Sequence, residues 1–391
     1  MAAVAAIVLA AGVLVWRPWH HDAAAVTAPH ADPSVPGTSV SVGGTDCGQG
    51  WTGTRTGLQR WALVNTDIAP VEVYLRDART DRIYLDVENL GSGASRAASA
   101  TLGPGTYEFV CLPADKGPSY GSPRTLSGTT PATVTAPTVP ITSAELLVPL
   151  RQYHDWVAGR LPRLLAQVRR LDGDVRADDL GAARRDWLAG HRTYETLGAA
   201  YGAFGDFDTA INAAPGPRDP ATDPQLFGFH KVEALLWSGA PAATVGTYTR
   251  ALVKAVVGLE RAFSAMSLRP IDIGLRAHEI LEGAIADELT GRTDAGSHTT
   301  LATIEANLTG TEAALRPLRP LLAAAGFDGL PAIDAALARS RQVLEAHHRG
   351  GRWAPLDSLG RHARETLDAT LEQTAELLSR VAVVTDPRKA M

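Results

Sequence analysis

The side chains best suited to chemistry lie in the stretch GFHKVEALLW, residues 228–237. His230 and Glu233 are three positions apart, so on a helix they project from one face and could chelate one metal ion. The residues around them are largely apolar, which indicates that one or both polar groups are partly buried and need partners. An HxxE pair also arises often by chance, so the competing interpretation is a satisfied histidine beside a solvated glutamate.

Other segments that are expected to be helical supply further metal-ligating side chains. The candidates are, in chain order, His191, Glu195, Asp206, Glu279 and Glu282. Glu279 and Glu282 compete for one position, and the sequence does not decide between them. A site of one imidazole and several carboxylate oxygens, contributed by different helices of a bundle, suits iron or manganese and admits zinc.

Several other kinds of site are excluded or disfavoured. The stretch HEILE, residues 278–282, resembles the start of the HExxH motif of zinc peptidases, but Glu282 stands in place of the second histidine. No P-loop motif is present. The formal net charge is -5 and no basic run stands out, so no nucleic-acid partner is expected.

The first residues predict export of the chain. Residues 2–16 form an uninterrupted apolar run, which as a helix would span roughly 22 Å and is short of a hydrocarbon core of roughly 30 Å. We interpret residues 1–16 as a signal or membrane-anchor segment, and residues 17–37 as a spacer. As an uncleaved anchor, the segment would hold the protein on a membrane surface.

A small β domain is expected over residues 38–121. Strands are predicted at residues 59–65, 71–77, 82–89 and 106–112. Cys47 and Cys111 both fall in this domain, and in an exported chain they are expected to form a disulfide. Residues 31–153 contain neither histidine nor methionine, so a blue-copper site of the usual type is excluded there.

The rest of the chain is expected to be a linker and a helical domain. Residues 122–143 are rich in Ser, Thr and Pro and predict a semi-extended linker. Helices are expected near residues 144–170, 178–203, 224–238, 241–266, 270–290, 298–324, 330–348 and 357–383. Eight helices over residues 144–385 predict two four-helix bundles or one elongated double bundle.

At these residues the chain resembles the imelysin-like family, and within it the EfeO group of extracytoplasmic iron-uptake components. The matching stretches are YETLGAAYGAFGDFDTAIN (194–212), GFHKVEALLW (228–237), EILEGAIADELTG (279–291) and SHTTLATIEANLTGTEAALRPL (297–318). GTDCG (44–48) and LGPGTYEFVC (102–111) resemble the cupredoxin-like domain of that group. The resemblance covers nearly everything from residue 40 to residue 384.

The resemblance implies a cupredoxin-like β-sandwich followed by an imelysin-like double four-helix bundle that holds a metal. His230 and Glu233 match the family's HxxE directly, and Glu195, Asp206 and Glu279 are carried over by position. The partners implied are an iron permease and a haem-containing peroxidase of the same uptake system. A metal in the β domain is not expected, because that domain lacks histidine and methionine and a disulfide would remove both thiolates.

The function expected first is a non-catalytic, extracytoplasmic component that binds iron for uptake, with zinc and manganese as alternative metals. The alternative is an imelysin-type metallopeptidase, which would need an open metal position and a nearby general base. The missing second histidine favours transport over hydrolysis. An adhesion or scaffold protein, in which the HxxE is incidental, is the third interpretation.

Overall fold

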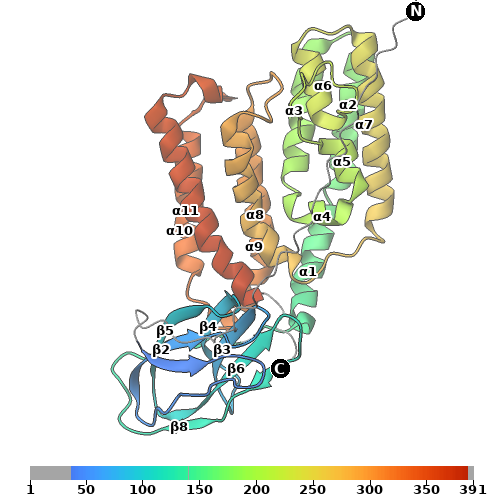
Figure 1. Ribbon diagram of the computed structural model, residues 1–391. Coiled ribbons are helices and arrows are strands. Elements are labelled where there is room, and N and C mark those ends of the chain that lie inside the picture. Colours follow the sequence, from blue (N-terminus) through green and yellow to red (C-terminus); the bar gives the residue numbers. More distant parts are fainter. Residues whose placement is uncertain (1–36, 140, 386–391) are drawn as a thin grey trace, which may run out of the picture.

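The structure, a computed structural model, describes residues 37–139 and 141–385. The expected signal or anchor segment, residues 1–16, lies outside this range. Within the described range, no helix has the length and apolar character that a membrane crossing requires. The expected fold class is confirmed, because a β domain of two sheets precedes a helical bundle domain and lies at one end of it (Figure 1).

The β domain contains eight strands. They are β1 (Thr38–Ser41), β2 (Gly57–Val64), β3 (Val71–Asp77), β4 (Ile83–Leu90), β5 (Ser95–Leu102), β6 (Gly105–Pro113), β7 (Ser119–Tyr120) and β8 (Arg124–Leu126). One sheet has the order β1-β2-β5 and the other has the order β4-β3-β6-β7, with β8 also paired to β6. The four predicted strands correspond to β2, β3, β4 and β6. Strand β5 was not predicted, because its sequence SRAASATL lacks the large side chains that mark a strand.

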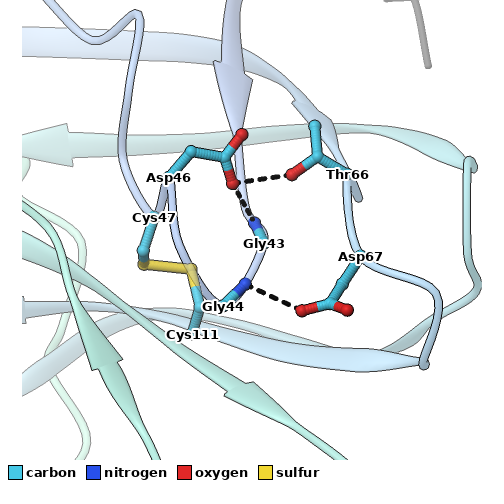
Figure 2. Close-up of a disulfide and its surroundings, with 7 residues drawn as sticks. All are labelled: Gly43, Gly44, Asp46, Cys47, Thr66, Asp67 and Cys111. Carbon is cyan, nitrogen blue, oxygen red and sulfur yellow. Dashed lines mark hydrogen bonds between the residues drawn. A yellow bond between two sulfur atoms is a disulfide. The ribbon is translucent and has the colours of Figure 1, made fainter. Parts of the chain in front are cut away.

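The core between the two sheets is aromatic and is closed by the predicted disulfide. Trp51, Trp61 and Phe109 pack edge to face, with ring centroids 5.4–5.9 Å apart. Cys47 and Cys111 are joined, with Cα atoms 5.8 Å apart. Figure 2 shows the loop that carries Cys47, where Asp46 Oδ1 accepts hydrogen bonds from the Gly43 amide and the Thr66 hydroxyl.

The linker is bound to both domains rather than free of them. Ile83 and Thr138 exchange two backbone hydrogen bonds of 2.8 Å, and the next residue, Val139, donates its amide to the Ala325 carbonyl at 2.8 Å. The segment expected to be a semi-extended linker therefore contains β8, adds to the β domain and then contacts the end of a helix of the bundle.

The helical domain forms two groups of four helices, and α1 belongs to neither group (Figure 1). Its helices are α1 (Ser143–Ala158), α2 (Leu161–Arg176), α3 (Leu180–Glu195), α4 (Tyr201–Phe204), α5 (Asp206–Asn212), α6 (Gly228–Trp237), α7 (Ala242–Phe263), α8 (Asp272–Ala286), α9 (Thr300–Ala324), α10 (Leu330–Glu345) and α11 (Arg361–Thr385). Three short 3-10 turns are η1 (Gly198–Ala200), η2 (Glu288–Thr290) and η3 (Leu356–Ser358). Helices α2, α3, α6 and α7 pack as one group, and α8 to α11 pack as the other.

Apolar residues at helical spacing explain this packing. On α7, for example, Val245, Leu252, Val256 and Leu259 are fully buried on one face. Two predicted helices differ from the structure in continuity. The helix expected at residues 144–170 is divided at Gly159, and the helix expected at residues 178–203 ends at Glu195 and continues as short turns.

Candidate functional site

A cavity of about 580 Å³ lies between the two helix groups. Its polar lining comes from both groups: Glu195, Tyr201, Asp208, Asn212 and His230 from the first, and Arg276, Glu279, Glu288 and Asn307 from the second. Three of the five residues predicted as ligands, Glu195, His230 and Glu279, therefore line one cavity although they come from three separate helices.

Glu195 is the last residue of α3 and is buried. Its Oε1 accepts a hydrogen bond from Asn212 Nδ2 at 2.7 Å, and its Oε2 accepts one from Asn307 Nδ2 at 2.8 Å. Burial alone would raise the pKa of this carboxyl, but contact with His191, the Asn307 hydrogen bond and the charge of His230 lower the pKa to about 2. Glu195 is thus held as a buried carboxylate with fixed orientation.

The HxxE pair lies on α6 with both side chains buried. Nδ1 of His230 is 3.4 Å from Oε2 of Glu233, and Oε1 of Glu233 accepts the backbone amides of Ala295 and Ser297, each at 3.1 Å. Both oxygens of Glu233 are therefore engaged. Burial would lower the pKa of His230, but Glu233, Glu288 and Glu195 outweigh it and raise the pKa.

The start of α6 depends on Gly228. Its φ is +77°, and a Cβ atom there would lie 2.1 Å from the Ile211 carbonyl oxygen at the end of α5. Only glycine fits both the left-handed backbone and this close approach. On the same helix, the Phe229 carbonyl accepts the indole N–H of Trp187 at 2.9 Å, which locks α6 against α3. These contacts fix the position of His230 relative to Glu195.

The structure places Asp206 outside the cavity. It is the exposed first residue of α5, whereas Asp208, two positions later, lines the cavity and accepts a 2.5 Å hydrogen bond from the Tyr194 hydroxyl. Burial raises the pKa of Asp208, and the Tyr194 hydrogen bond offsets part of that effect. The segment GDFD was recognised from the sequence, but the acidic residue on the cavity wall is the second one.

The two acidic candidates on α8 also differ in position. Glu279 lines the cavity and is paired with Arg276, one turn earlier. The Glu282 side chain is 60% exposed and lies 3.9 Å from His278. Of the two, only Glu279 contacts the cavity, and its charge is already compensated by an arginine.

Glu288, in the short turn η2, was not predicted as a ligand but faces the same cavity as His230. Burial and the negative charge of Glu195 raise the pKa of Glu288 to about 7, against the opposing effect of His230. A carboxyl group with a pKa near neutrality, beside a second carboxylate and an imidazole, is typical of a functional site.

The β domain contains a separate acidic cluster. Among the described residues, the only group of three or more metal-type side chains whose donor atoms all lie within 4.8 Å of one another is Glu72, Asp86 and Glu88. The donor atoms around the helical cavity are spread more widely over its walls. Exposed acidic groups of this kind are common without a metal, so the cluster does not identify a site.

The chain is similar in sequence to proteins of known name. No protein-family model matches it. It is 26% identical over 297 residues to a protein of Yersinia pestis named iron uptake system component EfeO, an alignment that covers 75% of this chain and 77% of that protein. The chain is a homologue of the EfeO iron-uptake components.

A second EfeO protein, from Escherichia coli strain K12, is 24% identical over 301 residues and again aligns over 75% of this chain and 77% of its own length. The resemblance to the EfeO group expected from the sequence is confirmed. A crystal structure of an iron-regulated protein A precursor from Parabacteroides distasonis has a TM-score of 0.49 and 12% identity, covering 64% of this chain and 98% of that one.

Proposed function

We propose that this chain is the extracytoplasmic iron-binding component of an iron-uptake system and that it carries the metal in the cavity between its two helix groups. The observation that carries the proposal is the convergence of His230, Glu195 and Glu288 on one cavity from α6, α3 and η2. The name of the EfeO relatives agrees with it. Iron is the cargo of such a protein, so no catalytic residue is required.

The expected ligands are the imidazole and carboxylate side chains that line the cavity. His230 would bind through Nε2, because its Nδ1 faces Glu233. Glu195 and Glu288 would supply carboxylate oxygens, and Asp208 and Glu279 lie on the same wall as further donors. This set of one nitrogen and several oxygens suits iron and manganese and admits zinc.

Glu233 is expected to orient His230 rather than to bind the metal itself. Unlike Glu195, it does not line the large cavity, and its two oxygens face His230 and the amides of Ala295 and Ser297. A carboxylate that holds the second nitrogen of a metal-binding histidine fixes the tautomer and the ring orientation. The HxxE motif would then supply one ligand and its support from the same helix face.

The implied partners are an iron permease and a haem peroxidase of the same uptake system. A carrier of this kind must release its cargo, which fits a site that opens to solvent through a wide cavity rather than a closed structural site. The N-terminal segment would place the protein outside the cytoplasm, either secreted or held at the membrane surface.

Metal-dependent thermal melting tests the proposal. The wild type should gain stability as Fe²⁺ is added under anaerobic conditions, following mass action. The double substitution His230→Ala and Glu233→Ala should remove this gain while the apo-protein remains folded. Glu282→Gln, at an exposed position on α8, is the matched control and should behave as the wild type. An equal iron-induced shift in the double variant would show that the site lies elsewhere.

The metallopeptidase alternative is tested with the same proteins. No HExxH helix is present to place two imidazoles and a base around zinc, so we expect no cleavage of unstructured peptides above the level of His230→Ala. Chelator-sensitive cleavage by the wild type that is lost in His230→Ala would establish the peptidase instead.

A further inference from the structure

His191 is a buried histidine close to the proposed site. It lies on α3 one turn before Glu195, is 2% exposed, and its ring stacks on Trp187 with centroids 5.0 Å apart. Nε2 lies 3.2 Å from Glu195 Oε1, but at an angle that forms no hydrogen bond, and Nδ1 also has no hydrogen-bond partner. Nδ1 of a deeply buried imidazole therefore lacks the partner that burial normally demands, and Nε2 has only the contact with Glu195.

The position of His191 relative to His230 fits a shared ion. The two rings meet edge to face, with centroids 5.3 Å apart and planes inclined by 75°. Two imidazoles that bind one metal through bonds of about 2.1 Å place their ring centres roughly 5 Å apart. The distance between the ring centres is thus compatible with a shared ion, although the two rings come from different helices.

A small space lies beside both rings. Its volume is about 10 Å³, and His191, His230, Glu233 and Glu288 contribute to its walls. That volume is on the order of one water molecule or one ion. His230, Glu288 and Thr293 also line the large cavity, so the two spaces adjoin at these three residues. The small space therefore borders the cavity that is proposed to hold the metal.

We propose that His191 is a second nitrogen ligand of the metal, so that the site contains two imidazoles, His191 and His230, together with the carboxylates Glu195 and Glu288. This inference rests on the proposed function and specifies its chemistry. Two imidazoles shift the preference of a carboxylate site toward borderline ions such as Fe²⁺, Co²⁺ and Zn²⁺ and away from Mn²⁺ and Mg²⁺. The cargo class is thus a borderline divalent transition metal.

A structural role for His191 makes a different prediction. A histidine that only supports Glu195 would lower the stability of the apo-protein when replaced by an apolar ring, because the buried carboxylate loses its 3.2 Å contact with Nε2. Loss of that support could also weaken metal binding through Glu195. Only a ligand role predicts that the number of imidazoles coupled to the metal falls by one.

The test compares the wild type, His191→Gln, His191→Phe and the control His278→Gln on α8. We expect the Co²⁺ and Fe²⁺ affinities of both His191 variants to fall about 100-fold. Mn²⁺ affinity should fall less than about fivefold, and His278→Gln should match the wild type. With one equivalent of Cu²⁺, pulsed EPR should count two coupled imidazoles in the wild type and one in His191→Gln.

A double variant, His191→Gln with His230→Asn, measures any copper signal from histidines elsewhere in the chain. Unchanged Co²⁺ affinity in both His191 variants, or a single coupled imidazole in the wild type above that background, would overturn the role of His191 while leaving the proposed function intact. Failure of the wild type to bind any of these metals would overturn both.

Discussion

The β domain and the helical domain treat their buried polar groups differently. In the β domain the side chain of Asn65 is fully buried, and its Nδ2 donates to the carbonyls of Ala69 and Leu90. In the helical domain His191 has no hydrogen-bond partner on either nitrogen, and Asn212 lacks one on Oδ1. Satisfied polar groups hold a fold, whereas unsatisfied groups beside a cavity indicate a missing ligand. Trp51 Nε1, in the aromatic core of the β domain, also lacks a hydrogen-bond partner but does not line the cavity, so the position of the unsatisfied groups, rather than their presence, points to the site.

The largest loss of stability is expected when the disulfide of the β domain is removed. Replacing Cys47 and Cys111 together with alanine should lower the free energy of unfolding of the β domain by about 4 kcal/mol, because the disulfide spans a sequence separation of 64 residues. Urea unfolding followed by tryptophan fluorescence measures the loss. The iron-induced stabilisation of the helical domain should persist, and its disappearance would show that the two regions are not independent in function.

A smaller loss of stability is expected at the start of α6. Gly228→Ala should lower the free energy of unfolding by about 2–3 kcal/mol, because the added Cβ meets the Ile211 carbonyl and the backbone is left-handed. Gly173→Ala, in the open interior of α2, is the matched control and should gain about 0.5–1 kcal/mol. Equal stability of the two variants would show that α6 can shift without cost.

A substitution at Glu233 tests whether this side chain orients His230 or binds the metal itself. Glu233→Gln keeps an acceptor for the His230 ring but removes the charge, so the iron affinity should fall about 10–100-fold without unfolding the protein. Isothermal titration with Fe²⁺ measures the change, and Glu282→Gln serves as the control. An affinity equal to that of the wild type would show that Glu233 serves only to accept the backbone amides of Ala295 and Ser297.

The smallest effect concerns an ion pair of the β domain that lies far from the cavity. The Lys116 ammonium, with the amides of Gly44 and Ile68, lowers the pKa of Asp67. Because the folded pKa is depressed, the stabilisation is present above the ordinary carboxyl value of about 3.9 and is lost as the pH falls through the folded pKa. The stability difference between the wild type and Lys116→Met, measured by urea unfolding from pH 7 to pH 2, should shrink toward the acid end. A constant difference would contradict this.

Much of the fold could be predicted from the sequence because the patterns are local. Residues 71–77 and 106–112 carry β-branched and aromatic side chains, and they form β3 and β6. Strand β5 escaped detection because alanine and serine resemble a loop in isolation, and only pairing with β2 makes the segment a strand. The break at Gly159 likewise depends on how α1 and α2 pack, which no local pattern specifies.

The lining of the cavity could be predicted only in part. His230 was predicted because it lies among apolar residues of a helix, whereas Glu195 was one of several helical carboxylates and was assigned by position from the resemblance to the EfeO group. Asn307 carries the same signal, since it follows Ile304 by three residues on the buried face of α9, but an amide was not considered as a carboxylate partner. Whether Asp208 or Asp206 lines the cavity depends on how the chain turns from α4 into α5. The approach of Glu288 to the cavity depends on how the chain turns from α8 into η2.

The position of the cavity between the two helix groups has a mechanical consequence. An ion bound by His230 and Glu195 on one side and by Glu288 on the other would act as a removable cross-link between halves that are otherwise held by side-chain packing and by hydrogen bonds such as that from Asn307 to Glu195. Any motion that separates the halves would then weaken the hold on the ion, and the ion would resist that motion by the same free energy. A receptor that separates the two helix groups would therefore release the metal without contacting it.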